Sequence, residues 1–128
     1  MTSKQPKPTV AELEILRVLW ESGPHSVREI QRLMNEVKPT GYTTVLKLLQ
    51  IMTDKGLVNR DEKQRPQIYR ARYPREHTQR QLLHDLRQRA FGGSVKALVL
   101  QALAGPRSSQ KDLEEMEKLL DRMEGENK

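Results

Sequence analysis

Residues 41–58 read GYTTVLKLLQIMTDKGLV, and the middle of this stretch has the apolar spacing of an amphipathic helix. The apolar positions fall at i, i+3, i+4 and i+7, namely Val45, Leu48, Leu49 and Met52. The helix is expected to begin among Thr40, Gly41 and Tyr42, and Lys55-Gly56 supplies a cationic last turn and a glycine stop. After Gly56 the apolar period shortens from helical to alternating, which indicates that a strand follows the helix.

Two shorter helices are predicted before this one, over about Val10–Glu21 and Val27–Glu36. Each begins with the spacing of a capping box, in which a Ser or Thr and a later Glu satisfy each other's backbone amides. The two predicted boxes pair Thr9 with Glu12 and Ser26 with Glu29. Residues 1–8 are polar and contain two prolines, so we expect a flexible lead-in.

A β-hairpin is predicted after the long helix, with strands Leu57–Arg60 and Gln67–Tyr73 and a polar, basic loop at Asp61–Pro66. Three helices followed by a two-stranded hairpin are the arrangement of a winged helix-turn-helix domain. We therefore assign residues 9–73 to a winged-helix DNA-binding domain in which the hairpin is the wing.

Three more amphipathic helices are predicted, over about Arg75–Phe91, Ser94–Ala104 and from near Ser109 onward. They are too short to form a stable domain alone, and an identical subunit is the simplest partner for their apolar stripes. The fold class is thus mostly α with a small β-hairpin, and residues 74–128 form a C-terminal helical dimerisation region. The expected dimer contacts are Leu82, Leu86, Val95, Leu98, Val99, Leu103, Leu113, Met116 and Leu120.

The composition limits the kinds of partner and site. The net charge of the 128 residues is +6, yet residues 108–128 hold 4 Lys and Arg against 7 Asp and Glu, so the rest is more basic still. This imbalance favours a polyanion partner, although many small basic proteins bind no nucleic acid. The absence of cysteine excludes disulfides and thiolate metal sites. The sequence shows no apolar run of membrane-spanning length and no signal-peptide pattern, so we expect a cytoplasmic protein.

The long helix is the candidate DNA reader. When its apolar stripe faces inward, Thr43, Lys47 and Gln50 point the opposite way, and Thr44 lies at the flank. Such hydrogen-bonding side chains near a helix start are what a recognition helix presents to base edges. Two alternatives stay open, namely that Thr43 and Thr44 only cap the helix and that Lys47 and Gln50 are ordinary solvated positions.

A second group of residues has the character of phosphate contacts. Cationic wing side chains suit the DNA backbone, and the start of the second helix offers free amides and a hydroxyl. This group comprises Ser26, Arg28, Tyr42, Arg60, Lys63, Arg65 and Arg72. The alternative is that the loop charges are simply solvated.

Enzymatic and metal-binding patterns are missing from the sequence. There is no glycine-rich phosphate loop, no His-Glu-x-x-His and no nucleophile elbow. His77 and His84 share a helix face but are separated by a rise of about 10 Å, too far for one ion. We expect no enzyme activity, no metal site and no cofactor.

Three stretches together resemble the penicillinase-repressor and methicillin-resistance-repressor family of bacterial regulators, and the likeness runs from about Thr9 to Met123. They are Glu12–Trp20, then Tyr42–Gln50 with Lys55–Val58, then Phe91–Leu100. The resemblance implies a homodimer that binds a palindromic operator, with the long helix reading bases and the C-terminal helices forming the dimer.

The resemblance also implies a release signal. In characterised members a membrane sensor-protease responds to a β-lactam, and the repressor is cut at an Asn-Phe bond inside the fifth helix. The matching pair here is Gln101-Ala102, which departs from that pattern. A copper-responsive branch carries a cysteine-rich tail, which this sequence lacks.

The function predicted from the sequence is therefore that of a DNA-binding transcriptional repressor. One alternative is a winged-helix adaptor that contacts proteins and has no DNA role. Another is a repressor that senses a small molecule in a pocket between the reader and the dimerisation region.

Overall fold

The computed structural model describes residues 6–104 and 110–126, except for the side chains of residues 116 and 123–126. The chain divides into two compact units, Met1–Arg80 and Gln81–Lys128. The expected fold class is confirmed, since the elements are helices together with a single two-stranded antiparallel hairpin in the described ranges. The predicted lead-in over residues 1–8 falls mostly outside the described residues.

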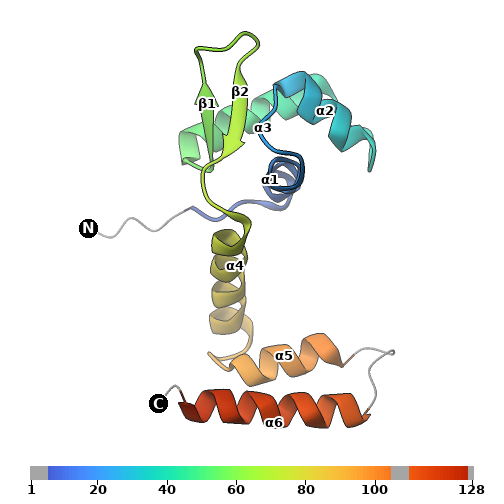
Figure 1. Ribbon diagram of the computed structural model, residues 1–128, viewed down its shortest axis with the longest axis vertical. Coiled ribbons are helices and arrows are strands. Elements are labelled where there is room, and N and C mark those ends of the chain that lie inside the picture. Colours follow the sequence, from blue (N-terminus) through green and yellow to red (C-terminus); the bar gives the residue numbers. More distant parts are fainter. Residues whose placement is uncertain (1–5, 105–109, 127–128) are drawn as a thin grey trace, which may run out of the picture. The chain divides into compact units, whose positions relative to one another are not determined.

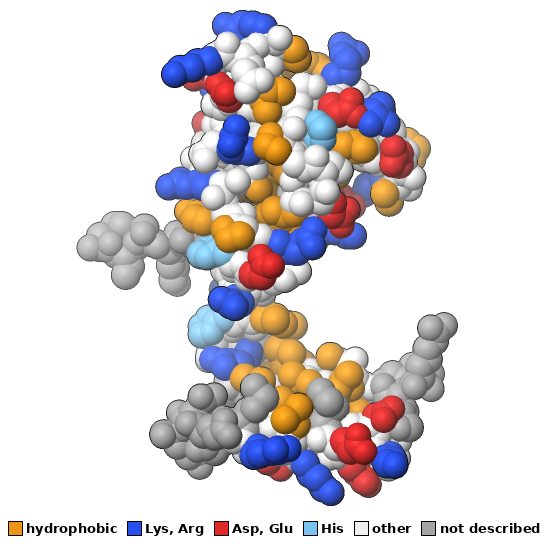
Figure 2. Space-filling view, in the orientation of Figure 1, with side chains coloured by type: hydrophobic (Ala, Val, Ile, Leu, Met, Phe, Trp, Pro, Cys, Tyr) orange, Lys and Arg blue, Asp and Glu red, His pale blue; other side chains and the backbone are white. Residues whose placement is uncertain are grey.

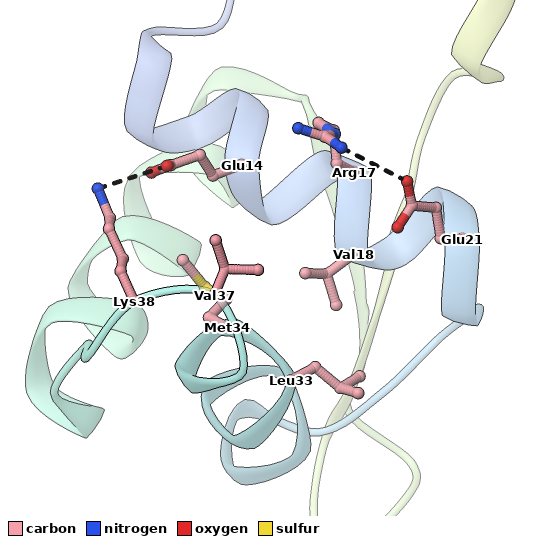
Figure 3. Close-up of a pocket in the computed structure, with 8 residues that line it drawn as sticks. All are labelled: Glu14, Arg17, Val18, Glu21, Leu33, Met34, Val37 and Lys38. Carbon is pink, nitrogen blue, oxygen red and sulfur yellow. Dashed lines mark ion pairs between the residues drawn. The ribbon is translucent and has the colours of Figure 1, made fainter.

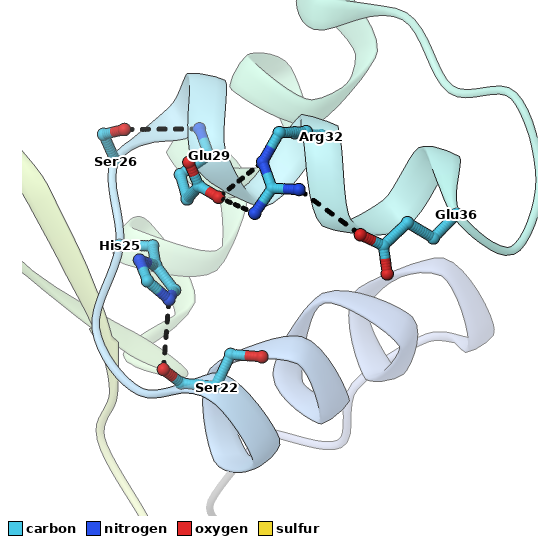
Figure 4. Close-up of polar contacts among 6 residues, drawn as sticks. All are labelled: Ser22, His25, Ser26, Glu29, Arg32 and Glu36. Atoms are coloured by element: carbon cyan, nitrogen blue, oxygen red, sulfur yellow. Dashed lines mark hydrogen bonds and ion pairs between the residues drawn. The ribbon is translucent and has the colours of Figure 1, made fainter.

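The first unit opens with two capped helices, α1 (Val10–Ser22) and α2 (Val27–Asn35). The capping box of α1 is confirmed, because Thr9 N donates to Glu12 Oε1 at 2.9 Å and Glu12 N donates to Thr9 Oγ1 at 3.2 Å. At α2 the box predicted from the sequence is only half formed. Ser26 Oγ accepts from Glu29 N at 3.3 Å, but the Glu29 carboxylate pairs with Arg32 instead of returning to Ser26 (Figure 4).

Helix α3 (Tyr42–Lys55) is bounded by two glycines. Gly41 is its N-cap and provides no side-chain cap, so the alternative that Thr43 or Thr44 caps this helix is wrong. Gly56 ends the helix in the left-handed region, at φ 82°, where the absence of a Cβ removes the steric penalty.

The predicted stripe of α3 is the centre of the core. Val45, Leu49 and Met52 are fully buried, and Leu48 packs against the same cluster. In this cluster α1, α2 and α3 pack against one another, β1 contacts α3 and β2 contacts α1 (Figure 1). The opposite face of α3 carries exposed side chains. The remaining buried members are Ile15, Leu16, Leu19, Ile30, Met34, Leu57, Val58 and Tyr69.

The hairpin consists of β1 (Val58–Asp61) and β2 (Ile68–Ala71), so the predicted strand ends were displaced. The register pairs Val58 with Ala71, Asn59 with Arg70, Arg60 with Tyr69 and Asp61 with Ile68. Leu57 lies outside β1 because its amide closes the end of α3 through Met52 O at 2.9 Å. Tyr73 lies outside β2, and its carbonyl accepts from Trp20 Nε1 at 3.0 Å.

The loop before α2 joins the hairpin as well. His25 N donates to Tyr69 O at 3.1 Å and Tyr69 N donates to His25 O at 2.9 Å, which is an isolated antiparallel bridge on β2. The wing is thereby attached to α3 through Leu57 and to the α1–α2 connection through His25.

The second unit contains the helical pair α5 (Val95–Leu103) and α6 (Gln110–Glu126), which lie side by side (Figure 1). Lys96 Nζ on α5 pairs with Glu117 at 3.4 Å and with Asp121 at 3.0 Å on α6. Helix α4 (Arg75–Ala90) crosses the division between the units and ends one residue earlier than expected, before the left-handed Gly92 and Gly93. The predicted helix starting near Ser109 begins at Gln110 in the described residues.

Candidate nucleic-acid interface

The exposed face of α3 carries the predicted base-reading residues. Thr43, Thr44, Lys47 and Gln50 are all exposed. Within the described part of the chain, these four side chains form no hydrogen bond or ion pair. Leu46 is half-buried beside them, and Ile51 is 40% exposed. This face therefore presents hydrogen-bond donors and acceptors without partners in the described residues, together with an exposed aliphatic side chain.

The starts of α2 and α3 come together beside that face. The Arg28 guanidinium lies over the Tyr42 ring, 5.3 Å from its centroid, and both residues are exposed. Ser26 caps α2 at the same end, with its hydroxyl oxygen accepting from Glu29 N (Figure 4). The structure thus brings Ser26, Arg28 and Tyr42 next to the N-terminal end of the exposed face of α3.

The wing loop is organised by an acidic residue. The Asp61 carboxylate accepts from Gln64 Nε2 at 2.8 Å and from Lys63 N at 3.0 Å, and these hydrogen bonds lower the Asp61 pKa. Arg65 Nη1 donates to Glu62 O at 2.6 Å, while the Lys63 side chain is exposed. Figure 2 shows basic side chains gathered at the tip of the hairpin. The loop therefore presents Lys63 and Arg65 on a structured turn.

Of the residues predicted to contact the DNA backbone, Arg60 is engaged within the wing and Arg72 lies at the far end of α3. Arg60 is half-buried, pairs with Glu62 at 3.4 Å, and has its pKa raised by Tyr69 and Glu62. Arg72 lies against the C-terminal end of α3, since a Cβ on Gly56 would stand 2.9 Å from Arg72 Nη1. About 20 Å of helix separates Gly56 from Tyr42, so Arg72 is not brought together with Arg28.

Two features that hold α3 in place were not predicted from the sequence. The nearly buried Glu12 carboxylate on α1 pairs with Lys55 Nζ at 2.7 Å. Burial opposes ionisation of Glu12, but the hydrogen bonds from Lys55 and Thr9 outweigh it and lower the pKa. The second feature is Asn35, which hydrogen-bonds the backbone of Thr40 just before α3. The pair of Glu12 and Lys55 has no local sequence signal. For the contact at Thr40, the one available signal is the spacing of the Gln31 and Asn35 amides, which lie one helical turn apart.

A shallow groove of about 160 Å³ lies between α1 and the end of α2 (Figure 3). Its floor is apolar, and its rim carries two ion pairs, Lys38 with Glu14 at 3.4 Å and Arg17 with Glu21 at 3.8 Å. The apolar lining residues are Val18, Leu33, Met34 and Val37. Because the rim charges neutralise one another, this face differs from the basic wing.

The predicted dimer contacts lie in the second unit, where helix α5 has no buried residue. Leu86 is 47% exposed and Val95 is 36% exposed. Leu82, Leu98, Val99, Leu103 and Leu113 are half-buried, Leu120 is 6% exposed, and the Met116 side chain lies outside the described residues. Hydrophobic side chains are visible on the surface of this unit (Figure 2). Gln101 and Ala102 are exposed within α5.

Within residues 6–104 and 110–126 no group of three or more His, Asp or Glu side chains is placed to hold a metal ion. Among the helices of the same ranges, none is both long enough and apolar enough to span a membrane.

Comparison with known proteins places the chain in a family. It is 21% identical to a penicillinase repressor of Staphylococcus aureus over 120 residues, covering 94% of this chain and 95% of that one. It is also 21% identical to a penicillinase repressor of Bacillus licheniformis over 118 residues, covering 92% of each chain. The family model described as penicillinase repressor matches residues 8–122, which is most of the chain. The chain therefore belongs to the penicillinase repressor family.

Proposed function

We propose that this protein is a transcriptional repressor that binds a palindromic DNA operator as a homodimer. The observation that carries the proposal is the division of α3 into two faces. Val45, Leu49 and Met52 anchor the helix in the core, while Thr43, Lys47 and Gln50 face solvent without partners in the described residues. A helix held in this way can enter the major groove and present its polar face to base edges.

The surroundings of α3 suit the backbone on either side of that groove. Arg28 of α2 and Tyr42 lie at the start of α3. Lys63 is exposed on the wing, and Arg65 is exposed beside it with one end of its guanidinium bonded to the loop backbone. Cations in these places neutralise phosphates and set the register of the protein on the duplex, while the α3 side chains select the sequence.

The dimer is proposed from the apolar surface of the second unit. Helix α5 is rich in Val, Leu and Ala, yet none of its residues is buried within one chain. A second copy would cover this surface and would place two reading helices on a site with twofold symmetry.

The proposal is tested by selecting bound sequences from a library of random duplexes and then measuring affinity against salt concentration. We expect a palindromic consensus, tighter binding to it than to random DNA, and a steep loss of affinity with added salt. Failure to bind duplex DNA at low salt would exclude the repressor and favour the protein adaptor.

Release from DNA by proteolysis is the finer part of the proposal, with a membrane sensor-protease as the partner. A cut between the exposed Gln101 and Ala102 would break α5, which packs on α6. The linkage between two half-site contacts would be lost, and affinity would fall with the effective concentration. Incubation with the cognate sensor-protease, followed by mass spectrometry, tests this, and an intact α5 would count against it.

A further inference from the structure

The turn between α2 and α3 is held by amide side chains of α2. Asn35 Nδ2 donates to Thr40 O at 3.0 Å, and Asn35 Oδ1 accepts from Thr40 N at 2.9 Å. Gln31 Nε2 donates to the same Thr40 carbonyl at 3.2 Å. Asn35 Nδ2 also donates to Gln31 O at 2.7 Å, which orients the Asn35 amide. Both backbone polar groups of Thr40 are therefore fixed to α2.

Thr40 stands immediately before the N-cap of α3. The N-cap residue of α3 is Gly41, which has no side chain that could hydrogen-bond the free amides of the first turn. The buried anchors of α3 begin at Val45, whereas the predicted readers begin at Thr43. The backbone that leads to the readers is thus held by Asn35 on one side and by the core on the other.

We propose that Asn35 is a positioning residue for DNA reading, and this rests on the proposed function of α3. Through Thr40, Asn35 sets the direction in which the chain enters α3. That direction determines where Thr43 and Lys47 meet the groove. Base recognition requires side chains to be held to within about 0.5 Å of the productive geometry. A turn released from α2 would allow the first turn of α3 to shift by more than this tolerance.

The contribution of Asn35 can be separated from general stability because its side chain is exposed and lies outside the core. Gln31 supplies a second donor to the same carbonyl, so the two amides are expected to be coupled. Loss of Gln31 alone leaves both Asn35 contacts with Thr40 in place, whereas loss of both amides frees the turn.

The test compares Asn35→Ala, Gln31→Ala and the double variant in the full chain, using affinity for the selected operator and for random duplex. We expect Asn35→Ala to weaken operator binding about tenfold, equivalent to about 1.4 kcal/mol. Binding to random duplex should change less than about twofold, because phosphate contacts tolerate small shifts. Gln31→Ala should have a smaller effect, and the double variant should lose more than the two single variants combined.

The matched control is Arg32→Gln combined with Glu36→Gln, which removes the ion pairs of Arg32 from α2 and its C-cap residue and leaves the net charge unchanged. It should retain the operator preference of the wild type. The inference is overturned if Asn35→Ala keeps the wild-type ratio of operator to random affinity, or if both affinities fall in parallel. A wild-type protein that binds DNA without sequence preference would overturn the proposed function of α3 and this inference with it.

Discussion

Side chains on α3 and on the wing are expected to play different parts in DNA binding, with α3 reading the sequence and the wing attracting the phosphates. Gln50 is exposed and has no partner in the described residues, and a bidentate amide contact to a base discriminates by about 1–3 kcal/mol. We predict that Gln50→Ala or Lys47→Ala lowers the ratio of operator to random affinity by that amount. Lys63→Ala on the wing should weaken both affinities alike and reduce the salt dependence. If all three variants lowered the operator and random affinities by the same factor, the assignment of α3 as the reader would be contradicted.

The pair of Glu12 and Lys55 makes a pH-dependent contribution to stability. The Glu12 pKa lies below its usual value in the folded state, so the stabilisation is present at neutral pH. It is lost as the pH falls below the ordinary Glu pKa of about 4.3 and through the lower folded value. We predict that Lys55→Met lowers the free energy of unfolding by about 1–3 kcal/mol at pH 7, because the buried Glu12 carboxylate loses its charged partner and keeps only the hydrogen bond from Thr9 N. Urea unfolding at pH 7 and at pH 4 should show the difference from wild type shrinking in acid.

The control for that measurement is Lys38→Met, which breaks the more exposed pair with Glu14. An exposed pair contributes at most about 1 kcal/mol, so this variant should unfold almost like wild type at both pH values. A difference between Lys55→Met and wild type that stays constant with pH would show that Glu12 ionisation is not the cause.

At the scale of elements, the end of α3 depends on one left-handed residue. Gly56 has φ 82°, and a Cβ there would also approach Arg72 Nη1 to 2.9 Å. Because that atom is the far end of a flexible side chain, backbone strain dominates the expected cost. We predict that Gly56→Ala destabilises the protein by about 1–2 kcal/mol in thermal or urea unfolding. Gly56→Asn should cost less, since Asn tolerates the left-handed region better. The prediction is wrong if both variants unfold alike.

The elements show which features a sequence can predict. The apolar stripe of α3 and the capping box of α1 were predicted correctly, because both depend on residues that are three or four positions apart. The strand ends were wrong because long-range contacts compete there: the Leu57 amide bonds Met52 O of α3, while its carbonyl still accepts from Arg72 N, and Tyr73 O accepts from Trp20 Nε1. The capping box of α2 failed because Arg32 competes for the Glu29 carboxylate. The Glu12–Lys55 pair spans 43 positions, and no local pattern reports such a contact.

In the whole molecule, an uncovered apolar surface distinguishes the second unit from the first. The first unit buries a continuous core. Among the described side chains of the second unit, Leu120 is the one hydrophobic residue that is buried. Leu86 is 47% exposed and Val95 36% exposed within one chain, so a lysine at either position can lay its aliphatic stem along the surface and keep its ammonium group in solvent. If the surface is a dimer interface, buried lysines there would be unpaired and costly.

We therefore predict that Leu86→Lys together with Val95→Lys converts a dimer to a monomer in analytical ultracentrifugation. Operator affinity should fall about 100-fold or more, because two half-site contacts would no longer be linked. Val37→Lys is the matched control, since Val37 is 88% exposed but lies in the first unit. It should remain dimeric. If the double variant stays dimeric and the Val37 variant dissociates, the interface lies on the first unit, and the second unit must cover its apolar surface in another way.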